Sequence, residues 1–290
     1  MQELTIPKDM RAWSRAERAR GRRIGFVPTM GFLHEGHLRL LDRAKERADR
    51  VVMSIFVNPL QFGPQEDLTQ YPRDLERDRK LAAERGVDCL FVPDTSAMYP
   101  TEPLVRVSPG PMADTLEGAA RRGHFAGVLT VVAKLFHIVE PDIAVFGRKD
   151  FQQAMLVRRL AADLDFGLEI DVAPTVRELD GLALSSRNTY LKGDDRRAAL
   201  ALSRALRAVE QAWRGGEADP KGLARRGMDV LTAPGVTPEY LALVDDQMRP
   251  VSRADAHSVV VIAARVGTTR LIDNVVLGEG VASDIAVRAS

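Results

Sequence analysis

The chain has 290 residues, of which 45% are hydrophobic and 28% are charged, as is typical of a globular protein. Its 41 Lys and Arg residues nearly balance its 40 Asp and Glu residues, so the net charge of +1 creates no overall field for nucleic acid or an anionic membrane. The single cysteine, Cys89, excludes an internal disulfide framework and suits a reducing compartment. No signal peptide is recognisable and no apolar run approaches the ~18 residues of a membrane span, so we expect a cytoplasmic protein.

Short apolar runs alternate with helical patterns over the first part of the chain, which predicts βαβ units and a parallel sheet. The expected strands are 24–27, 51–57, 89–92, 143–146 and 168–173. The expected helices are 37–49, 72–85, 126–139 and 150–164, with Gly86 and Pro141 ending the second and third. The pattern therefore predicts an α/β fold with a Rossmann-like N-terminal domain over 1–175, which would bind ligands at the carboxyl ends of its strands.

Beyond Asp180-Gly181 the pattern changes. A long amphipathic helix is expected at 194–214 and a second at 220–232, after the capping pair Asp219-Pro220. Three β-rich runs follow, at 240–244, 258–266 and 270–277. Helices followed by strands predict a smaller α+β domain with an antiparallel sheet over 176–290, which we expect to act as a lid.

The segment 28–37, PTMGFLHEGH, falls between the first expected strand and the first expected helix. Its glycines allow the backbone to turn sharply and to approach a ligand closely. His34 and His37 lie at the start of the helix, where unpaired N–H groups and the helix dipole favour an anion. A surface pair or half of a metal site is the alternative, but zinc proteases space these histidines four apart and no nearby cluster completes a zinc site. We therefore predict a polyphosphate site.

Two further strand ends carry polar side chains. Asn58 and Gln61 are neutral amides that can bind hydroxyl groups or a carboxylate, although alone they would suit an ordinary proline-containing loop. Lys149 follows another expected strand and is a mobile cation suited to phosphate. Asp150 could cap the next helix, and Gln153 would project from the same face of that helix.

The tripeptide Ser185-Ser186-Arg187 combines two hydroxyl groups with a guanidinium group, which together suit the oxygens of a terminal phosphate. Such a tripeptide is common by chance, so its weight depends on the other motifs. The chain contains no GxxxxGK[ST] and no GxGxxG, so neither a P-loop nor a dinucleotide fingerprint explains the predicted nucleotide site.

Taken together, these motifs resemble the pantoate–β-alanine ligase family of the HxGH nucleotidylyltransferase superfamily. Seven segments carry the resemblance in order: PTMGFLHEGH (28–37), NPLQFG (58–63), YPRD (71–74), HFAGVLTVV (124–132), FGRKDFQQ (146–153), PTVRELDGLALSSRN (174–188) and GTTRLIDN (267–274). The resemblance implies a homodimeric cytoplasmic enzyme that uses ATP and magnesium to condense (R)-pantoate with β-alanine. The reaction would pass through a pantoyl adenylate and release pyrophosphate and AMP.

The resemblance also implies roles for individual residues. The ATP site would comprise Met30, Gly31, Phe32, Leu33, His34, Glu35, Gly36, His37, Gly147, Arg148, Lys149, Asp150, Val176, Leu184, Ser185, Ser186 and Arg187. His37 would donate a proton and would form the catalytic set with His34, Lys149 and Arg187. Pantoate would be held by Gln61 and Gln153 together with Asn58 and Met30, and Gln61 would also lie beside β-alanine. Asp78 is the candidate metal ligand.

Two positions depart from the family pattern, since Arg148 stands where glutamate is usual and Leu184 where methionine is usual. Two other functions fit parts of the sequence. An adenylyltransferase of the same superfamily would transfer AMP to a phosphorylated acceptor, but Gln61 and Gln153 argue against it because such an acceptor calls for further cations. A non-catalytic nucleotide-sensing module would bind ATP without releasing pyrophosphate.

Overall fold

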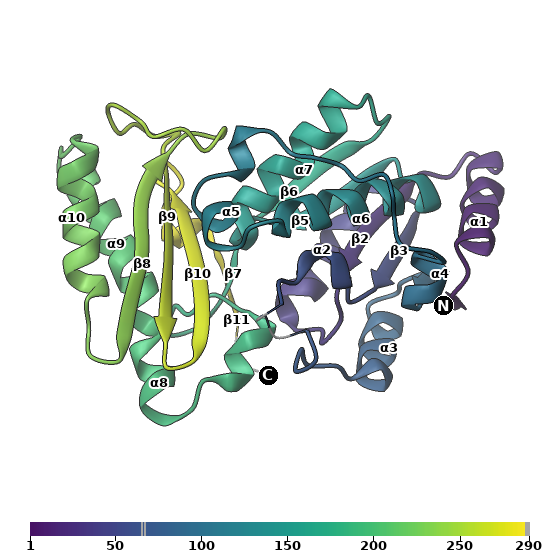
Figure 1. The fold of residues 1–290 in the computed structure, drawn as a ribbon, viewed down its shortest axis with the longest axis horizontal. Coiled ribbons are helices and arrows are strands. Elements are labelled where there is room, and N and C mark those ends of the chain that lie inside the picture. Colours follow the sequence, from purple (N-terminus) through teal and green to yellow (C-terminus); the bar gives the residue numbers. More distant parts are fainter. Residues whose placement is uncertain (65, 67, 288–290) are drawn as a thin grey trace. The chain divides into compact units, whose positions relative to one another are not determined.

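The computed structural model describes residues 1–64, 66 and 68–287 (Figure 1). The chain divides into two compact units. The first unit contains Met1–Gly147 and Gln152–Ala173, and the second contains Arg148–Phe151 together with the chain from Pro174 onward. The boundary expected from the sequence, between residues 175 and 176, kept Arg148–Phe151 in the first part.

The first unit is built on a six-stranded parallel sheet with the order β1-β4-β3-β2-β5-β6. Its strands are β1 (Gln2–Leu4), β2 (Ile24–Thr29), β3 (Arg50–Ile55), β4 (Cys89–Phe91), β5 (Ile143–Gly147) and β6 (Glu169–Ala173). Strand β2 lies between β3 and β5, so the direction of strand succession reverses beside it, as in doubly wound folds. The Rossmann-like prediction is confirmed.

Helices cover both faces of this sheet: α1 (Pro7–Ala19), α2 (Glu35–Arg47), α3 (Leu75–Glu84), α4 (Thr95–Met98), α5 (Glu117–Ala120), α6 (His124–Val139) and α7 (Phe151–Asp163). On one face, the apolar stripe of α2 packs against Val51 and Met53 of β3. On the other face, Phe136 of α6 contacts Phe146 of β5. Successive strand residues point to opposite faces, so an apolar run without alternation marks a strand covered on both sides.

The sequence analysis missed β1 and α1. Strand β1 has three residues, all at least partly exposed, so no buried apolar run marks it. Helix α1 buries only Met10, Ser14 and Glu17, and two of these are polar. A helix that buries so little apolar surface leaves a weak periodic signal.

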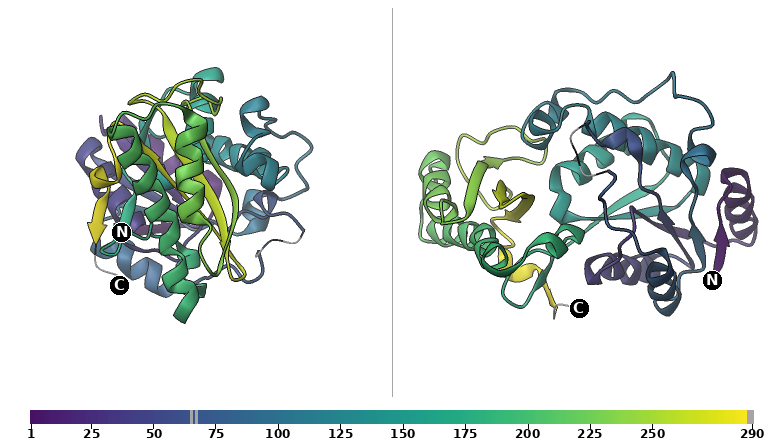
Figure 2. Two further views of the ribbon diagram at one scale, coloured as in Figure 1. Left: turned by 90° about the vertical axis from the view of Figure 1, so that its left-hand side faces the viewer. Right: turned by 60° about the horizontal axis from the view of Figure 1, so that its bottom comes forward.

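The second unit contains a three-stranded antiparallel sheet with the order β10-β9-β8 and a two-stranded parallel pair of β7 and β11. These strands are β7 (Val176–Glu178), β8 (Val236–Val244), β9 (Val259–Val266), β10 (Thr269–Val276) and β11 (Ile285–Val287). The helices are α8 (Gly193–Ala198), α9 (Leu200–Arg214) and α10 (Pro220–Leu231). Helices α9 and α10 cover one face of the antiparallel sheet (Figures 1 and 2). The predicted α+β pattern is confirmed.

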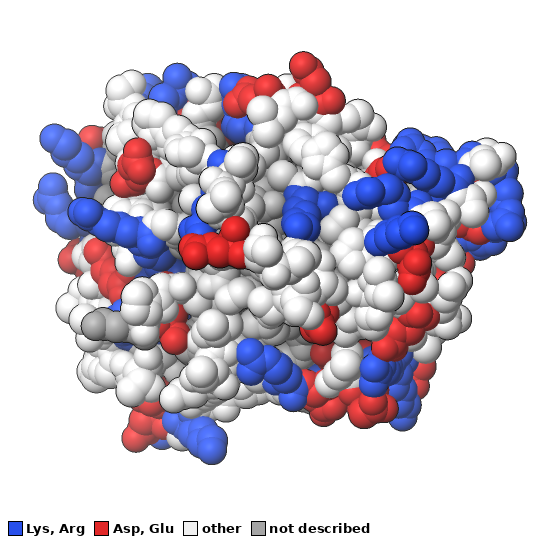
Figure 3. Space-filling model, turned by 45° about the vertical axis from the view of Figure 1, so that its right-hand side comes forward, with Lys and Arg blue, Asp and Glu red and all other residues white. Residues whose placement is uncertain are grey.

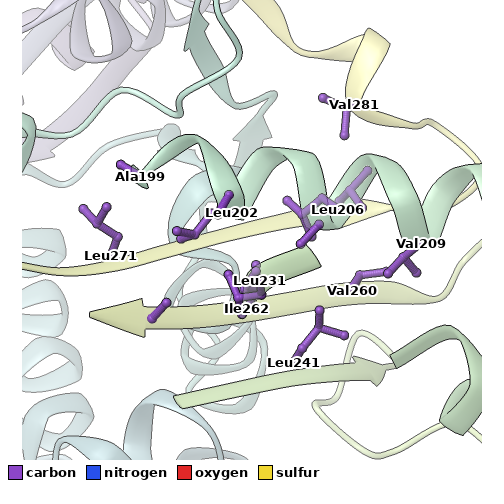
Figure 4. Packing of buried hydrophobic residues seen from close by; sticks show 14 of the residues in the cluster. Ala199, Leu202, Leu206, Val209, Leu231, Leu241, Val260, Ile262, Leu271 and Val281 are labelled. Atoms are coloured by element: carbon purple, nitrogen blue, oxygen red, sulfur yellow. The ribbon is translucent and has the colours of Figure 1, made fainter. Parts of the chain in front are cut away.

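Figure 4 shows how the core of the second unit forms: Leu202, Leu206 and Val209 of α9 point toward Val260 and Ile262 of β9. Their spacing of four and three residues places them on one side of the helix.

The single helix expected at 194–214 is wrong, because the structure ends α8 at Ala198 and starts α9 at Leu200. The intervening Ala199 is fully buried and keeps helical dihedral angles. Leu202 N donates to Ala199 O at 3.3 Å, so the turn tightens locally to an i→i+3 bond. The pattern of apolar residues is unaffected by this tightening, which is why it does not reveal the break.

Charged groups of both signs are distributed over the face drawn in Figure 3. Many arginines of the first unit have acidic partners. Arg15 pairs with Glu140 at 2.8 Å and Arg18 with Asp142 at 2.6 Å. Such pairing limits the field that a cluster of arginines can exert. Among the described residues, no helix is long and apolar enough to cross a bilayer.

Candidate active site

The backbone turns sharply between β2 and α2, at the start of the sequence-predicted ATP site. Gly31 and Phe32 adopt left-handed conformations, with φ of +84° and +52°. A Cβ atom on Gly31 would lie 3.0 Å from both Asp78 Oδ2 and Ile55 Cγ2, so this position needs glycine for space as well as for conformation. A left-handed phenylalanine is uncommon and persists only where neighbouring groups hold it.

Asp78 of α3 supplies that hold. Its two carboxylate oxygens accept hydrogen bonds from Phe32 N and Leu33 N, each at 2.7 Å. Arg77 adds a bond from Nη1 to Leu33 O at 2.7 Å. Burial raises the pKa of Asp78, whose side chain is almost wholly removed from solvent. The structure therefore gives Asp78 a role in fixing the turn.

The prediction that Asp78 is a metal ligand does not fit this arrangement, because both of its oxygens already accept backbone N–H groups inside the protein. Within the described part of the chain, no group of three His, Cys, Asp or Glu side chains is arranged to hold a metal ion.

His34 and His37 form a capping box at the N-terminus of α2. Gly36 N donates to His34 Nδ1 at 3.1 Å, and His34 N donates to His37 Nδ1 at 3.3 Å. An Nδ1 atom that accepts a hydrogen bond carries no proton, so the neutral ring carries its proton on Nε2. The capping geometry thus selects the tautomer in which each ring donates from Nε2. The ring centroids are 4.1 Å apart, which places two such donors at one helix end.

Glu35 brings an acidic group into this segment, but its charge is balanced locally. Its carboxylate pairs with Arg39 at 3.0 Å and with Arg85 at 2.9 Å. These pairs reduce the repulsion that a phosphate group would meet at the start of α2.

The 3-10 helix Pro59–Gln61, which follows β3, positions the amides of Asn58 and Gln61. Asn58 is 1% exposed and uses all of its hydrogen-bonding capacity within the protein. Its Nδ2 donates to Gly127 O at 3.1 Å and to Gln61 Oε1 at 3.2 Å, while its Oδ1 accepts from Tyr99 Oη at 3.0 Å and Leu60 N at 3.3 Å. Asn58 therefore orients Gln61, a role different from the substrate contact that the sequence suggested.

The side-chain NH₂ group of Gln61 has a weak hydrogen-bond acceptor, the sulfur of Met30. Its Nε2 donates to Met30 Sδ at 3.0 Å, and a thioether sulfur is a weak acceptor. A carboxylate or hydroxyl oxygen would be a stronger partner for that amide. Gln61 and Met30 follow β3 and β2, two neighbouring parallel strands, so both lie at the carboxyl edge of the sheet.

His124, at the start of α6, contacts the backbone of Gln61 and was not identified as functional from the sequence. Its Nδ1 lies 2.8 Å from Gln61 O, and its Nε2 lies 2.9 Å from Nη1 of Arg121, which pairs with Glu66 at 2.6 Å. Because arginine is always a donor, Nε2 accepts and Nδ1–H donates to Gln61 O. Burial lowers the pKa of His124 to about 4. The ring is therefore neutral at physiological pH. His124 begins the segment HFAGVLTVV, which contributed to the family resemblance, but the sequence alone indicated no role for this histidine.

The two glutamines at the start of α7 have different surroundings. Gln152 is buried, with Nε2 donating to Met112 O at 2.9 Å and Thr115 O at 3.0 Å, and it therefore supports the neighbouring loop. Gln153 is half-buried and its side chain makes no hydrogen bond to the described residues. Its amide is thus available to a ligand, in keeping with its predicted role.

The second unit holds the other predicted phosphate ligands. Lys149 is half-buried, and its Nζ lies 3.6 Å from Oδ1 of the exposed Asp150. Ser185 caps the 3-10 helix Ser186–Tyr190, with its Oγ accepting from Arg187 N at 3.3 Å. A hydroxyl group that accepts one hydrogen bond still has its proton to donate to an anion.

Val176 and Leu184 are joined by a backbone hydrogen bond from Leu184 N to Val176 O at 2.9 Å. The side chain of Val176 is buried, so any contact of this residue with a nucleotide would come from its backbone.

Comparison with known proteins identifies the family. The sequence profile of pantoate–β-alanine ligase matches residues 2–276. The chain belongs to the pantoate–β-alanine ligase family. One relative, pantothenate synthetase from Pelotomaculum thermopropionicum, is 50% identical over 273 residues, which cover 93% of this chain and 97% of the relative.

Solved structures of ligases from this family share the fold. Pantothenate synthetase from Thermus thermophilus matches with a TM-score of 0.91 and 46% identity, covering 96% of this chain and 99% of that one. A Francisella tularensis ligase, solved with beta-gamma ATP and β-alanine, matches with a TM-score of 0.81 and 34% identity, covering 97% of this chain and 99% of that one. The family resemblance and the fold class expected from the sequence are both confirmed.

The structure shows the surroundings of Arg148, at the position where the family resemblance leads us to expect glutamate. Arg148 is buried in the second unit, where Nη2 donates to Asp284 Oδ1 at 2.8 Å and Nη1 pairs with Glu279. Two acidic partners compensate the charge of a buried guanidinium group. The Arg148 side chain is therefore committed to the interior of its own unit.

Proposed function

We propose that this ligase joins pantoate to β-alanine through an acyl adenylate, and that the residues described above carry out both steps. In the first step a pantoate carboxylate oxygen attacks the α-phosphorus of ATP, and the bond to the bridging oxygen breaks as pyrophosphate leaves. In the second step the β-alanine amine attacks the acyl carbon, loses a proton and displaces AMP. The observation that carries the proposal is the capping box of His34 and His37, which presents two Nε2–H donors at a helix N-terminus.

Catalysis of the first step is electrostatic, since negative charge shifts toward the departing pyrophosphate. His37 would donate a hydrogen bond from Nε2–H to the phosphate groups, with His34 beside it. Lys149, Arg187 and the hydroxyl groups of Ser185 and Ser186 would balance the remaining charge. The other ATP contacts would be made by Met30, Gly31, Phe32, Leu33, Glu35, Gly36, Gly147, Asp150 and Leu184, and by the backbone of Arg148 and Val176, whose side chains are buried.

Gln61 and Gln153 would bind pantoate, because neutral amides can bond its hydroxyl groups and carboxylate without neutralising the nucleophile. The weak sulfur partner of Gln61 supports this role, since a substrate oxygen would replace it favourably. Met30 would line the same site, Asn58 would orient Gln61, and Gln61 would also lie beside β-alanine.

Magnesium would reach the site with ATP, held chiefly by the phosphate oxygens, which is usual for this ion. This assignment agrees with the poor fit of Asp78 to a metal and assigns no step to a protein-held ion. We also propose that the enzyme is a cytoplasmic homodimer, as the family resemblance implies.

A pyrophosphate-release assay tests the proposal. ATP and pantoate without β-alanine should release about one pyrophosphate per active site and should yield an acyl adenylate that hydroxylamine traps. Adding β-alanine should produce continuous turnover with equal amounts of AMP and pyrophosphate. Pyrophosphate release that requires a phosphorylated acceptor in place of pantoate would show an adenylyltransferase, and ATP binding without any release would show a sensing module.

A further inference from the structure

Strand β10 contacts both basic segments of the second unit. These segments are the 3-10 helices Arg148–Asp150, which carries Lys149, and Ser186–Tyr190, which carries Arg187. Because a strand paired along its length is rigid, residues on β10 are well placed to fix the backbone of both segments. The sequence segment GTTRLIDN, which ends on this strand at Asn274, has no role in the function described so far.

Asn274 binds the backbone of the lysine segment directly. Its Nδ2 donates to Arg148 O at 2.9 Å and to Lys149 O at 2.9 Å. The side chain is 2% exposed, so water does not compete for either bond. Both protons of one amide nitrogen are therefore used to hold two consecutive carbonyl groups, which fixes the direction in which Lys149 leaves the backbone.

A buried ion network holds Asn274 in turn. Arg177 pairs with Asp273 through bonds of 2.6 and 2.8 Å and with Asp284 at 2.6 Å. Arg177 Nη2 also donates to Asn274 O at 3.3 Å, and Asn274 N donates to Asp273 Oδ1 at 2.8 Å. Arg148 joins the same network through Asp284. Asn274 is thus anchored on both sides of its backbone.

The amide oxygen of Asn274, Oδ1, takes no part in holding the lysine segment. Asn274 Oδ1 is buried and accepts no hydrogen bond from any described residue. Turning the amide over would place this oxygen against the carbonyl oxygens of Arg148 and Lys149, which is repulsive. The orientation of the amide is therefore set by its two bonds to the carbonyl groups of Arg148 and Lys149.

We infer that Asn274 is a positioning residue that aims Lys149 at the phosphate groups of ATP. The inference rests on the proposed function, in which Lys149 contacts those groups. A cation that must meet a phosphate within about half an ångström benefits from a fixed backbone, and a misplacement of about 1 Å can cost on the order of 100-fold in rate.

A double-mutant cycle tests the inference with the full-length enzyme. The variants are Asn274→Ala, Lys149→Ala and the double substitution, and the readout is the dissociation constant of a non-hydrolysable ATP analogue, which stays measurable when turnover is lost. Val275→Ala is the matched control, because Val275 is the neighbouring buried residue on β10 and packs in the apolar core. Asn274→Ser keeps one donor and provides a milder variant if the alanine variant does not fold.

Asn274→Ala should weaken binding of the analogue about 10-fold in the otherwise native enzyme and less than about 2-fold in the Lys149→Ala background, since contacts that act through one group are not additive. Asn274→Ser should be intermediate and Val275→Ala close to native. An equal loss in both backgrounds, or an equal loss from Val275→Ala, would overturn the inference while leaving the role of Lys149 intact. Native binding and turnover in Lys149→Ala alone would instead overturn the phosphate role of Lys149.

Discussion

Burial determines the protonation state of His124. The ring accepts from Arg121 and donates to Gln61 O, and this arrangement requires one proton, on Nδ1. A second proton would have to lie on Nε2, facing an arginine, in surroundings that solvate charge poorly. The neutral ring therefore holds the backbone of Gln61 in place, and acid should disrupt this contact.

This gives a pH dependence of stability with a defined sign. The pKa of His124 is about 4 in the folded protein against 6.5 in the unfolded chain, so between these values the unfolded chain binds a proton that the folded protein does not. Stability is therefore lost as the pH falls from 6.5 to 4, by about 3 kcal/mol from this residue. Denaturant unfolding of the wild type and His124→Gln should show a difference in unfolding free energy that changes by this amount across the window. Parallel curves would contradict the assignment.

His37 should matter for chemistry more than for folding. Its ring caps α2 through Nδ1 and is proposed to donate from Nε2. His37→Asn keeps an acceptor near the cap but removes that donor, and His37→Ala removes both. Both variants should lower the rate of pyrophosphate release about 10²–10³-fold, the usual effect of losing one transition-state donor. The exposed His257 provides the control, since His257→Ala should leave the rate unchanged. A folded His37→Asn variant with native turnover would refute the role of His37 as a hydrogen-bond donor to the phosphate groups.

At the scale of elements, helix α3 maintains the turn that ends β2. Asp78 reaches from α3 to Phe32 N and Leu33 N, whereas Asp74 only caps the same helix by accepting from Arg77 N at 3.1 Å. Substituting Asp78 therefore tests the support of the turn, whereas substituting Asp74 tests only the stability of helix α3.

Asp78→Asn should replace one accepting oxygen by an NH₂ group that faces a backbone N–H, which releases the left-handed turn at Phe32. We expect adenylation to fall at least about 10-fold, because the turn positions the histidine pair. Asp74→Ala should cost about 1 kcal/mol of stability, typical for loss of an N-cap, and should leave adenylation close to native. Stopped-flow pyrophosphate release and denaturant unfolding measure the two effects. Equal losses of adenylation in both variants would show that α3 acts only through its stability.

The elements that the sequence revealed are those that bury apolar surface. Strands such as β3 and β5 are covered on both faces, so their apolar runs are continuous and easily recognised. Helix α1 was not predicted because it buries little apolar surface. The break at Ala199 was not predicted because the i→i+3 bond there leaves the apolar stripe unchanged. Local sequence patterns indicate which residues are buried, and they do not indicate which backbone groups form hydrogen bonds with each other.

At the scale of the whole molecule, the sequence suggested residues for ligand contact but did not identify the residues that hold those side chains in place. His34, His37 and Lys149 are polar groups placed where a strand ends, so their position alone suggested phosphate. Asn58, Asp78, His124 and Asn274 act through contacts with residues 3 to 126 positions away. Such contacts exist only in the folded chain, and no local pattern distinguishes a supporting side chain from one that contacts substrate.

The proposed ATP ligands are divided between the two units, since His34 and His37 belong to the first and Ser185, Ser186 and Arg187 to the second. If both sets bind one triphosphate, ATP should order the segment 175–190, whose regular structure consists only of the short strand β7 and one 3-10 helix. Hydrogen exchange in 175–190 should therefore slow when a non-hydrolysable ATP analogue binds, while exchange in the core strand β9 stays unchanged. In Arg187→Ala the slowing should be reduced in 175–190 but retained in 28–37, because the histidine pair can still bind phosphate. Exchange in 175–190 that does not respond to the analogue would show that the second unit takes no part in binding the triphosphate.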